Sequence, residues 1–381
     1  MATNTSTDMC SLYLHFQLTL NASIDNHTAC VNNPEDDPNI VTSSMRFYTY
    51  SVPVILAIGI LGNLVSLRVF LSRNMRKLSA STYLAALSTS DIMALVFYVL
   101  MEWLRWGLPS WNNDGQLEFL NAAGICQALF YFSYVSRFLS AWFIVTFTVE
   151  RYIGVCHPLK RKDICGSRSA QKVICSLILI SLIVMLFKPI LTSSREFQTR
   201  NSVVRRCLPD SQQLMTSFVL DSIYGLSITV VPFLIISILN ALIIRKLLHR
   251  YQRHRKINIV TEESIIRMEF TVILLVVSFV FIVLNLPYCF VWCKRFLLSN
   301  SKRTGREDIW ADFDNLEGVL MITRVIFYMN YCVNFFLYSV TGAYFRKELM
   351  ILVFYRSQRY SDYLKCSRNG NSSPTTPQSW V

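Results

Sequence analysis

Residues 270–287 read FTVILLVVSFVFIVLNLP, a run without a single charged side chain. A helix needs about 20 apolar residues to cross the hydrocarbon core of a bilayer, and this run with its flanks is long enough. Over all 381 residues, 52% are hydrophobic and only 16% are charged. A typical soluble domain has about 25% charged residues. The composition indicates a membrane protein and excludes a soluble enzyme, a zinc module and a nucleic-acid-binding domain.

Other stretches of the chain have the same apolar character. Seven spans are expected, at residues 47–72, 79–106, 123–153, 170–191, 214–245, 268–298 and 315–341. None alternates apolar and polar residues as a strand does, and lipid admits only helices or closed barrels. Prolines inside the spans, among them Pro53, Pro189, Pro232 and Pro287, are expected to kink their helices. The predicted fold class is all-α, a seven-transmembrane helix bundle.

The loops between the spans set the orientation. Basic residues follow the first, third, fifth and seventh spans, as at Arg73, Lys160, Arg250 and Arg346, and they carry most of the basic excess behind a net charge of +13. Basic loops face the cytoplasm, so the N-terminus is expected outside the cell and the C-terminus inside. We therefore expect a multi-pass protein of the plasma membrane.

The N-terminal tail supports this orientation independently. It carries three Asn-x-Ser/Thr glycosylation sequons, at Asn4, Asn21 and Asn26. Cys10 and Cys30 lie in the same tail and either pair with each other or with an extracellular loop. The expected organisation is an extracellular glycosylated tail (1–45), a seven-helix transmembrane domain (46–342), an amphipathic membrane-surface helix (343–356) and a disordered cytoplasmic tail (357–381).

Short motifs occur in a fixed order along the spans. They are Gly62-Asn63, Leu87-Ser-Thr-Ser-Asp91, Cys126, Glu150-Arg151-Tyr152, Pro232, Pro287, Asn334-Phe-Phe-Leu-Tyr338 and Phe345. In this order the chain after residue 46 resembles the rhodopsin-like (class A) G-protein-coupled receptors. Within them it resembles the peptide-receptor branch, that is, neuropeptide receptors of the FMRFamide-like and thyrotropin-releasing-hormone-like type. The resemblance implies a receptor that activates heterotrimeric G proteins and is not an enzyme.

The resemblance assigns roles to residues near the cytoplasm. It implies a G-protein switch made of Glu150, Arg151, Tyr152 and Tyr338, in which Glu150 restrains Arg151 at rest. Some members of the family add a second acid on the sixth span, but that position is Arg267 here, so this lock is expected to be absent. Glu269, two residues further on, is expected to be a poor substitute for that second acid.

The resemblance also implies an ion site in the middle of the membrane. A carboxylate such as Asp91 is costly at that depth unless it is paired. Family geometry would place four polar residues around it: Asn63, Ser140, Asn330 and Asn334. Oxygen donors with one carboxylate suit a hard cation, in this family sodium, with Asp91 as the metal ligand. The alternative is a hydrogen-bonded water cluster, and no other cofactor is expected.

On the extracellular side, the resemblance implies a disulfide between Cys126 and Cys207 that pins the loop above the ligand cavity. The chain departs from the family pattern in four of its spans. The fourth span lacks the usual Trp. Asn285 stands where a Trp is usual, Phe335 replaces a Pro in the seventh span, and Asn240 replaces a Tyr in the fifth. The loss of the Trp puts the usual aromatic switch of the sixth span in doubt.

The residues facing the cavity narrow the ligand class. Ser133 stands where amine receptors have an Asp, and Tyr328 stands where opsins have a Lys, so both classes are set aside. The expected ligand-binding residues are Glu102, Arg105, Ser133, Tyr134, Arg137, Lys188, Asp221, Asn285, Tyr288, Arg324 and Tyr328. Arg137 lies near mid-membrane and needs a partner, either Glu102 or an acidic group of the ligand.

A short extracellular neuropeptide suits so polar and aromatic a cavity. The alternatives are a lipid or another small acidic mediator as ligand, and a salt-bridge network with only a structural role. A transporter is disfavoured because the chain shows no internal repeat. A membrane enzyme is disfavoured because no histidine pair has metal spacing within a span.

The cytoplasmic tail suggests further partners. Phosphorylation at Ser372, Ser373, Thr375, Thr376 or Ser379 would attract arrestin-like proteins, unless the tail is merely solvated. The end Ser379-Trp-Val381 has the form that PDZ domains bind by strand addition. Cys366 is a weaker candidate for palmitoylation, because it lies well beyond the expected surface helix.

Overall fold

The computed structural model describes residues 40–111, 117–159, 165–198, 203–254, 262–301 and 308–353. Several predictions concern other parts of the chain. The sequons at Asn4, Asn21 and Asn26, the Cys10 and Cys30 pair, Cys366 and the Ser379–Val381 end lie outside the described residues.

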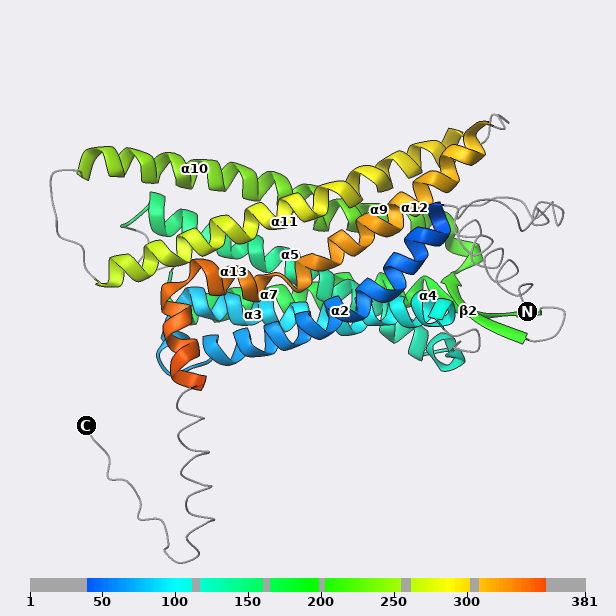
Figure 1. The fold of residues 1–381 in the computed structure, drawn as a ribbon, viewed down its shortest axis with the longest axis horizontal. Helices are drawn as coiled ribbons and strands as arrows, with labels where there is room; N and C mark the ends of the chain where they lie inside the picture. The colour runs from blue at the N-terminus through cyan, green and yellow to red at the C-terminus, as the bar shows by residue number, and fades with distance from the viewer. Residues whose placement is uncertain are drawn as a thin grey trace, which may run out of the picture.

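The described chain is an elongated bundle of helices (Figure 1). Its main helices are α2 (Ile40–Phe70), α3 (Ser79–Ala94) with α4 (Met101–Trp111), α5 (Ile125–Cys156), α7 (Ser167–Val184) with α8 (Phe187–Ile190), α9 (Leu214–Ile228) with α10 (Val230–His254), α11 (Glu262–Ser301), α12 (Asp308–Tyr328) and α13 (Asn334–Thr341). By length and composition, six helices can cross a membrane, and the bent pair α12–α13 makes a seventh span. The seven-span prediction is confirmed, although the first helix begins at Ile40 rather than near residue 47.

Burial separates central from peripheral spans. In the most apolar stretch of each span, 61% of residues are buried in α5, against 22% for Ser167–Ile190 and 17% for Ser211–His249. The peripheral helices therefore present wide apolar faces, including Leu179, Ile183 and Ile238, that suit lipid. α5 packs at the centre, so residues on it can reach several neighbouring helices.

The second span is irregular in its middle. A π-helical turn, η2 (Leu95–Leu100), joins α3 to α4. Such a turn adds a residue to the helix and rotates everything beyond it relative to a regular helix. Glu102 and Arg105 lie directly after this turn, so their direction cannot be extrapolated from Asp91 at 3.6 residues per turn.

The seventh span is bent by 51° between Leu316–Tyr331 and Asn334–Thr341 without a proline at the break. A 3₁₀ turn, η6 (Met329–Tyr331), interrupts the helix there. Asn63 Nδ2 donates to the carbonyl oxygen of Tyr331 at 2.7 Å and Asn330 Nδ2 to that of Phe327 at 3.0 Å. Side-chain amides thus satisfy carbonyl groups at the break.

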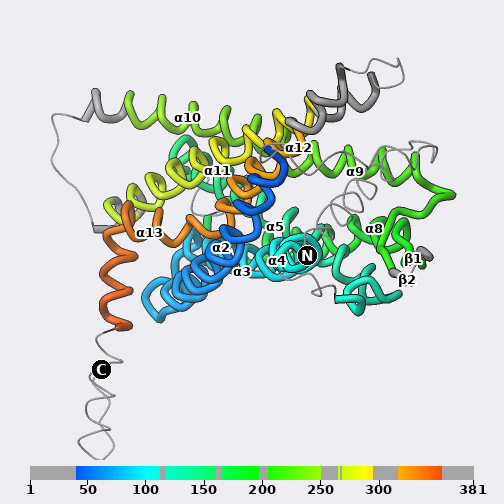
Figure 2. The backbone as a smooth tube through the Cα atoms, turned by 45° about the vertical axis from the view of Figure 1, so that its right-hand side comes forward, coloured from blue at the N-terminus to red at the C-terminus, as the bar shows by residue number. Residues whose placement is uncertain are grey.

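A β-hairpin between the fourth and fifth spans was not predicted. Strands β1 (Thr192–Gln198) and β2 (Val203–Pro209) pair antiparallel, with Ser194 opposite Cys207. Both views place the hairpin at the end of the bundle opposite the helix over residues 343–353 (Figures 1 and 2). The two ends correspond to the extracellular and cytoplasmic sides expected from the loop charges.

The helix over residues 343–353 turns sharply away from α13 across the end of the bundle (Figure 1). Phe345, only 1% exposed, anchors it. Its ring lies 5.3 Å from that of Phe70 and 5.7 Å from that of Tyr338, measured between centroids. On the other face Met350 and Val353 are exposed, as a helix on a membrane surface requires.

Candidate functional site: a charged outer cavity and a cytoplasmic switch

Arg151 lies at the cytoplasmic end of α5 and is held by its neighbour. Its Nη2 is 2.8 Å from Oε2 of Glu150 and 3.4 Å from the hydroxyl of Ser79. The guanidinium also lies over the ring of Phe147 at 5.3 Å. Arg151 is 12% exposed and Glu150 5%, so the pair is shielded from water. This geometry matches the restrained arrangement that the resemblance implied.

The other two predicted switch residues lie nearby in different surroundings. Tyr152 packs edge-on against His157, with ring centroids 5.6 Å apart. Tyr338 is fully buried among Phe70 and Phe345, and its hydroxyl has no hydrogen-bond partner among the described residues.

Asp91 is fully buried in the last turn of α3, near the middle of the second span. Its Oδ1 accepts a hydrogen bond from the Ser140 hydroxyl at 2.6 Å, and its Oδ2 accepts one from Asn334 Nδ2 at 2.7 Å. Two of the four expected neighbours therefore contact the carboxylate directly. Asn63 and Asn330 form no direct hydrogen bond with the carboxylate in the described residues; their Nδ2 atoms donate to backbone carbonyls at the break of the seventh span.

Three buried oxygen atoms of the first and second spans have no hydrogen-bond partner among the described residues: Asn63 Oδ1 and the hydroxyls of Ser66 and Ser88. Ser88 lies one turn before Asp91 on the same helix. Such oxygens are the donors that a hard cation binds. The described residues contain no cluster of three His, Cys, Asp or Glu side chains that could hold a metal ion.

In the outer half, Lys188 and Asp221 pair with each other. Lys188 Nζ lies 2.9 and 2.8 Å from the two carboxylate oxygens of Asp221. The hydroxyl of Tyr134 donates to Oδ1 of the same carboxylate at 2.9 Å. Lys188 is 7% exposed and Asp221 31%, so the pair joins the fourth, third and fifth spans at the edge of the buried interior.

Arg137 occupies an aromatic cage on α5. Its guanidinium carbon lies 4.1 Å from the ring centroid of Tyr98, 4.8 Å from that of Tyr134 and 5.3 Å from that of Tyr224. Nε donates to the Ser133 carbonyl at 3.2 Å. Among the described residues no carboxylate forms an ion pair with it, and the side chain keeps partial exposure. Cation–π contacts thus replace a counter-ion.

Glu102 is therefore not the partner of Arg137. Its Oε2 lies 3.5 Å from Nη1 of Arg324 on the seventh span. Glu102 follows the π-helical turn, and its carboxylate pairs with a residue of α12 while also lining the space beside α5. Arg105 packs its guanidinium 4.6 Å from the Phe130 centroid and donates to the Leu120 carbonyl at 3.5 Å.

A small cleft opens between the second and third spans. It is lined by Phe97, Tyr98, Met101, Glu102, Arg105, Leu129, Phe130 and Ser133. Its enclosed space is only about 10 Å³, close to the room that one water molecule needs. A ligand group that enters here must therefore move the side chains that line the cleft. Three predicted ligand residues line this cleft: Glu102, Arg105 and Ser133.

The remaining predicted ligand residues lie on the sixth and seventh spans. Asn285 Nδ2 donates to the carbonyl of Phe281 one turn earlier, at 2.6 Å, so its amide is committed within α11. Tyr288 and Tyr328 both pack against Phe327, with ring centroids 5.2 and 6.3 Å away. Tyr328 is fully buried, which leaves it as support for the cavity wall.

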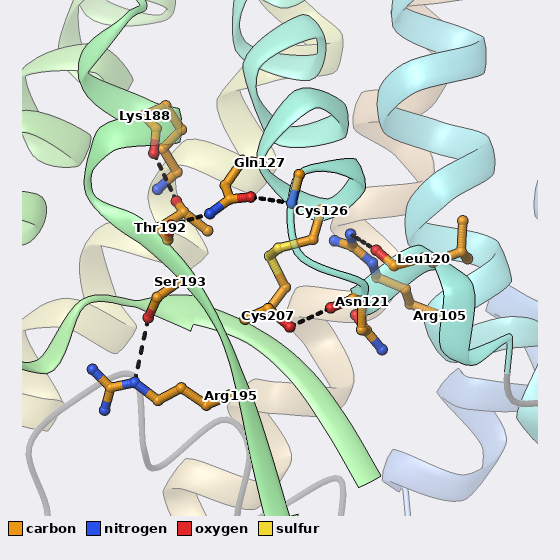
Figure 3. Close-up of a disulfide and its surroundings, with 12 residues drawn as sticks. Arg105, Leu120, Asn121, Cys126, Gln127, Lys188, Thr192, Ser193, Arg195 and Cys207 are labelled. Atoms are coloured by element: carbon orange, nitrogen blue, oxygen red, sulfur yellow. Dashed lines mark hydrogen bonds between the residues drawn. A yellow bond between two sulfur atoms is a disulfide. The ribbon is translucent and has the colours of Figure 1, made fainter.

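The hairpin covers this region from outside. Cys126 at the start of α5 is bonded to Cys207 on β2, as expected (Figure 3). Next to it, Gln127 Nε2 donates to the Thr192 carbonyl at 3.1 Å, and the Thr192 hydroxyl donates to the Lys188 carbonyl at 2.7 Å (Figure 3). A disulfide and side-chain hydrogen bonds therefore fix the hairpin to the third and fourth spans.

Two aromatic residues of the site were missed in the sequence. Tyr98 forms the closest wall of the Arg137 cage, and Phe130 covers Arg105. The available signal was that Phe130 lies four residues before Tyr134 in the third span, a spacing at which helical side chains share a face. Tyr98 lies in the π-helical turn, where this spacing rule does not apply.

A bundle of seven spans, a roofed outer cavity and a shielded Glu-Arg pair at the inner end define a membrane receptor that carries a signal across the bilayer. The profile of the family "7 transmembrane receptor (rhodopsin family)" matches residues 62–338. The chain belongs to this family, and together with the apolar helices this indicates a multi-pass receptor of the plasma membrane.

Similar proteins include several named receptors. The FMRFamide receptor of Drosophila melanogaster is 25% identical over 340 residues, 86% of this chain and 57% of that receptor. The thyrotropin-releasing hormone receptor of Gallus gallus is 30% identical over 154 residues, 38% of this chain and 37% of that receptor. The chain thus spans less than two thirds of both. Cysteinyl leukotriene receptor 2 of Homo sapiens is 24% identical over 321 residues, 84% of each chain.

Proposed function

We propose that this chain is a G-protein-coupled receptor for a short extracellular neuropeptide and that it activates heterotrimeric G proteins. The observation that carries the proposal is Arg137, a cation deep in the bundle that is caged by tyrosines and has no ion-pairing carboxylate among the described residues. Ionisable groups inside a membrane bundle are functional by default, and this one is free to bind a ligand.

The charges around Arg137 define what the ligand must supply. Lys188 is neutralised by Asp221 and Arg324 by Glu102. Arg105 and Arg137 remain, and in the described residues both are stabilised by rings and backbone carbonyls instead of carboxylates. A carboxylate or another acceptor-rich group on the ligand complements this excess. Trp103, Trp106 and Tyr288 add aromatic surface for its apolar side chains.

Two similar receptors support a peptide as the ligand. The names of the fly and chicken proteins give FMRFamide and thyrotropin-releasing hormone. The alternative is a lipid or other small acidic mediator, favoured by the name of the leukotriene receptor and by the same two unneutralised arginines. The cleft between the second and third spans is too small to hold either ligand without side-chain movement, so its size does not separate the two classes.

Asp91 would hold a sodium ion that favours the resting state. Its carboxylate, the Ser140 hydroxyl and the unpartnered oxygen of Asn63 are the donors that would bind it. In the same proposal Arg151, freed from Glu150, contacts the G protein. Arrestin-like proteins and a PDZ protein are further partners, and the chain signals rather than catalyses.

This function can be tested by applying a library of neuropeptides and lipid mediators to cells that express the chain. We expect a peptide to trigger nucleotide exchange on a G protein, and we expect Arg151→Ala at equal surface level to remove the response. A response to lipid mediators alone would select the alternative ligand class. A response that survives Arg151→Ala would contradict the assignment of the switch.

A further inference from the structure

The sixth span is tied to the membrane-surface helix by a carboxylate. Glu269, near the cytoplasmic end of α11, is half-buried. Its Oε1 accepts a hydrogen bond from the backbone N–H of Tyr344 at 2.6 Å. Tyr344 lies in the first turn of the helix over residues 343–353. Glu269, which was expected to be a poor substitute for an acid facing Arg151, bonds a different element.

This contact is strong and short in range. The first N–H groups of a helix have no partner within the helix, and the positive end of the helix dipole favours a carboxylate there. An N–H···O hydrogen bond usually has a nitrogen–oxygen distance of about 2.7–3.2 Å, and a contact at about 3.6 Å no longer counts as one. A displacement of α11 by about 1 Å from the surface helix is therefore enough to break the contact.

The surface helix is a rigid partner for Glu269. Phe345 is buried in the core, and Glu348, only 3% exposed, accepts hydrogen bonds from Ser72 at 3.1 Å and Asn74 at 2.8 Å. Gly342 lets the chain turn tightly, because a Cβ there would lie 2.7 Å from the Tyr338 carbonyl oxygen and 2.9 Å from Phe345 Cβ. The helix is thus fixed to the first span and the loop after it, and α11 is the element that can move.

Arg151 does not provide this restraint. In the described residues its ion pair is with Glu150, which lies on the same helix. This pair therefore does not connect α5 to α11. Yet Arg151 is only 12% exposed. A G protein can reach it only if the cytoplasmic ends of the spans separate. The inner half of α11 packs through Phe270 and Ile273 into the same core as Phe147.

We propose that the Glu269–Tyr344 contact is an autoinhibitory latch, which holds α11 against the surface helix at rest and must open before a G protein engages Arg151. Glu269 is a positioning residue in this scheme and does not itself contact the G protein. The latch rests on the G-protein coupling proposed above, but it does not depend on the identity of the ligand.

The test uses variants that remove the acceptor or the donor. Glu269→Ala removes the acceptor. Tyr344→Pro removes the donor N–H, and proline is tolerated in the first turn of a helix. Tyr344→Ala is the matched control, because it loses the same ring but keeps the N–H. Glu269→Gln keeps an acceptor oxygen without the charge and should give an intermediate result.

Two quantities are measured on purified, full-length receptor without ligand. The first is hydrogen–deuterium exchange of the backbone over residues 343–348. The second is nucleotide exchange on a panel of G proteins. We expect Glu269→Ala to accelerate both, with nucleotide exchange rising about five- to tenfold, because a tenfold shift raises a 1% active population to about 9%. Tyr344→Pro should raise nucleotide exchange similarly, and the double variant no further.

Two results would overturn the latch. Unchanged deuterium exchange in Glu269→Ala would mean that the contact does not exist in the receptor. Faster deuterium exchange with parental nucleotide exchange would mean that the contact exists but does not restrain signalling. A receptor that does not couple to G proteins would give a different result. The parent, Arg151→Ala and Glu269→Ala would then all show the same nucleotide exchange on every G protein.

Discussion

In the outer half of the bundle, cations outnumber carboxylates and lie against aromatic rings, whereas at the cytoplasmic end the carboxylates are held by specific donors. Arg137 and Arg105 face tyrosine and phenylalanine rings. Glu150 bonds Arg151, Glu269 bonds a helix N–H and Glu348 bonds the first cytoplasmic loop. The outer half therefore has charge to offer a ligand, and the inner end has its charge committed to neighbouring elements.

The difference follows from how each kind of group can be stabilised in a low-dielectric interior. A guanidinium can rest on π faces and still keep donors for an incoming acceptor. A carboxylate has no such option, and it must accept hydrogen bonds from the protein or lose stability. Arginines held by aromatic rings therefore suit a ligand-binding site that is empty at rest. Hydrogen-bonded carboxylates suit contacts between helices that break on activation.

The largest effect is expected at the inner end, from Arg151→Ala. Ligand binding should stay near the parental level while G-protein activation falls to background, because this side chain is the shielded cation of the switch. Radioligand binding and nucleotide exchange at matched surface expression measure the two quantities. If this variant signalled as strongly as the parent, Arg151 would not be the switch residue, and the cytoplasmic end would not have the role given to it above.

In the outer half, Arg137→Ala should weaken agonist potency by about 2–3 kcal/mol, roughly 30- to 150-fold, since a charged hydrogen bond is lost and its partner is left unpaired. Arg137→Lys should restore only part of the potency, because an ammonium lacks the planar fork. Concentration–response curves on surface-expressed receptor give the values.

A double-mutant cycle with Glu102 sharpens this result. Because Glu102 pairs with Arg324, the effects of Arg137→Ala and Glu102→Gln should add to within about 0.5 kcal/mol. If the double variant instead lost no more potency than either single variant, Arg137 and Glu102 would act as a pair, which was one of the two possibilities expected from the sequence. Unchanged potency in both single variants would move the ligand site toward the extracellular loops.

The Lys188–Asp221 pair tests whether burial decides the cost of breaking an outer ion pair. Asp221→Asn leaves the buried ammonium of Lys188 without its counter-ion and should cost about 2 kcal/mol of stability, whereas Lys188→Met leaves the more exposed carboxylate and should cost less. Melting of detergent-solubilised receptor ranks the two. The reverse order would show that exposure is a poor guide at this site.

The smallest effect is expected at Asp91. Asp91→Asn should abolish the dependence of agonist affinity on sodium, a change of a few-fold, because the cation loses its full countercharge. Agonist affinity is compared in sodium and in a large organic cation at equal ionic strength. An affinity of the parent receptor that is indifferent to sodium would leave a water cluster as the occupant of the site.

The spans were predictable because crossing lipid demands about 20 apolar residues, a constraint visible in residues 270–287 without any partner. The disulfide and the Glu150–Arg151 pair were also found, since both lie at motifs of the family. The hairpin was not found, because its two short strands pair only with each other within a loop.

Partner choice was the hardest part to predict. Glu102 was one of two expected partners of Arg137, but it follows the π-helical turn Leu95–Leu100 and pairs with Arg324. Asn63 and Asn330 were expected around Asp91, and the sequence did not show that their Nδ2 atoms donate to backbone carbonyls at the break in the seventh span. Such choices depend on local irregularities of a helix, which apolar periodicity does not record.

The bend between α12 and α13 bears on the speed of signalling. A proline at this place would remove a backbone donor permanently, but Phe335 keeps its N–H and an unlocked φ. At the bend, asparagine amides donate hydrogen bonds to backbone carbonyls. Ordinary helical N–H···O=C bonds can therefore replace these side-chain bonds, with little change in the total number of hydrogen bonds. We expect the seventh span to straighten and bend again reversibly, on the microsecond-to-millisecond scale typical of helix rearrangements. Relaxation-dispersion NMR on methyl-labelled Met329 would detect this motion, and Phe335→Pro should quench it.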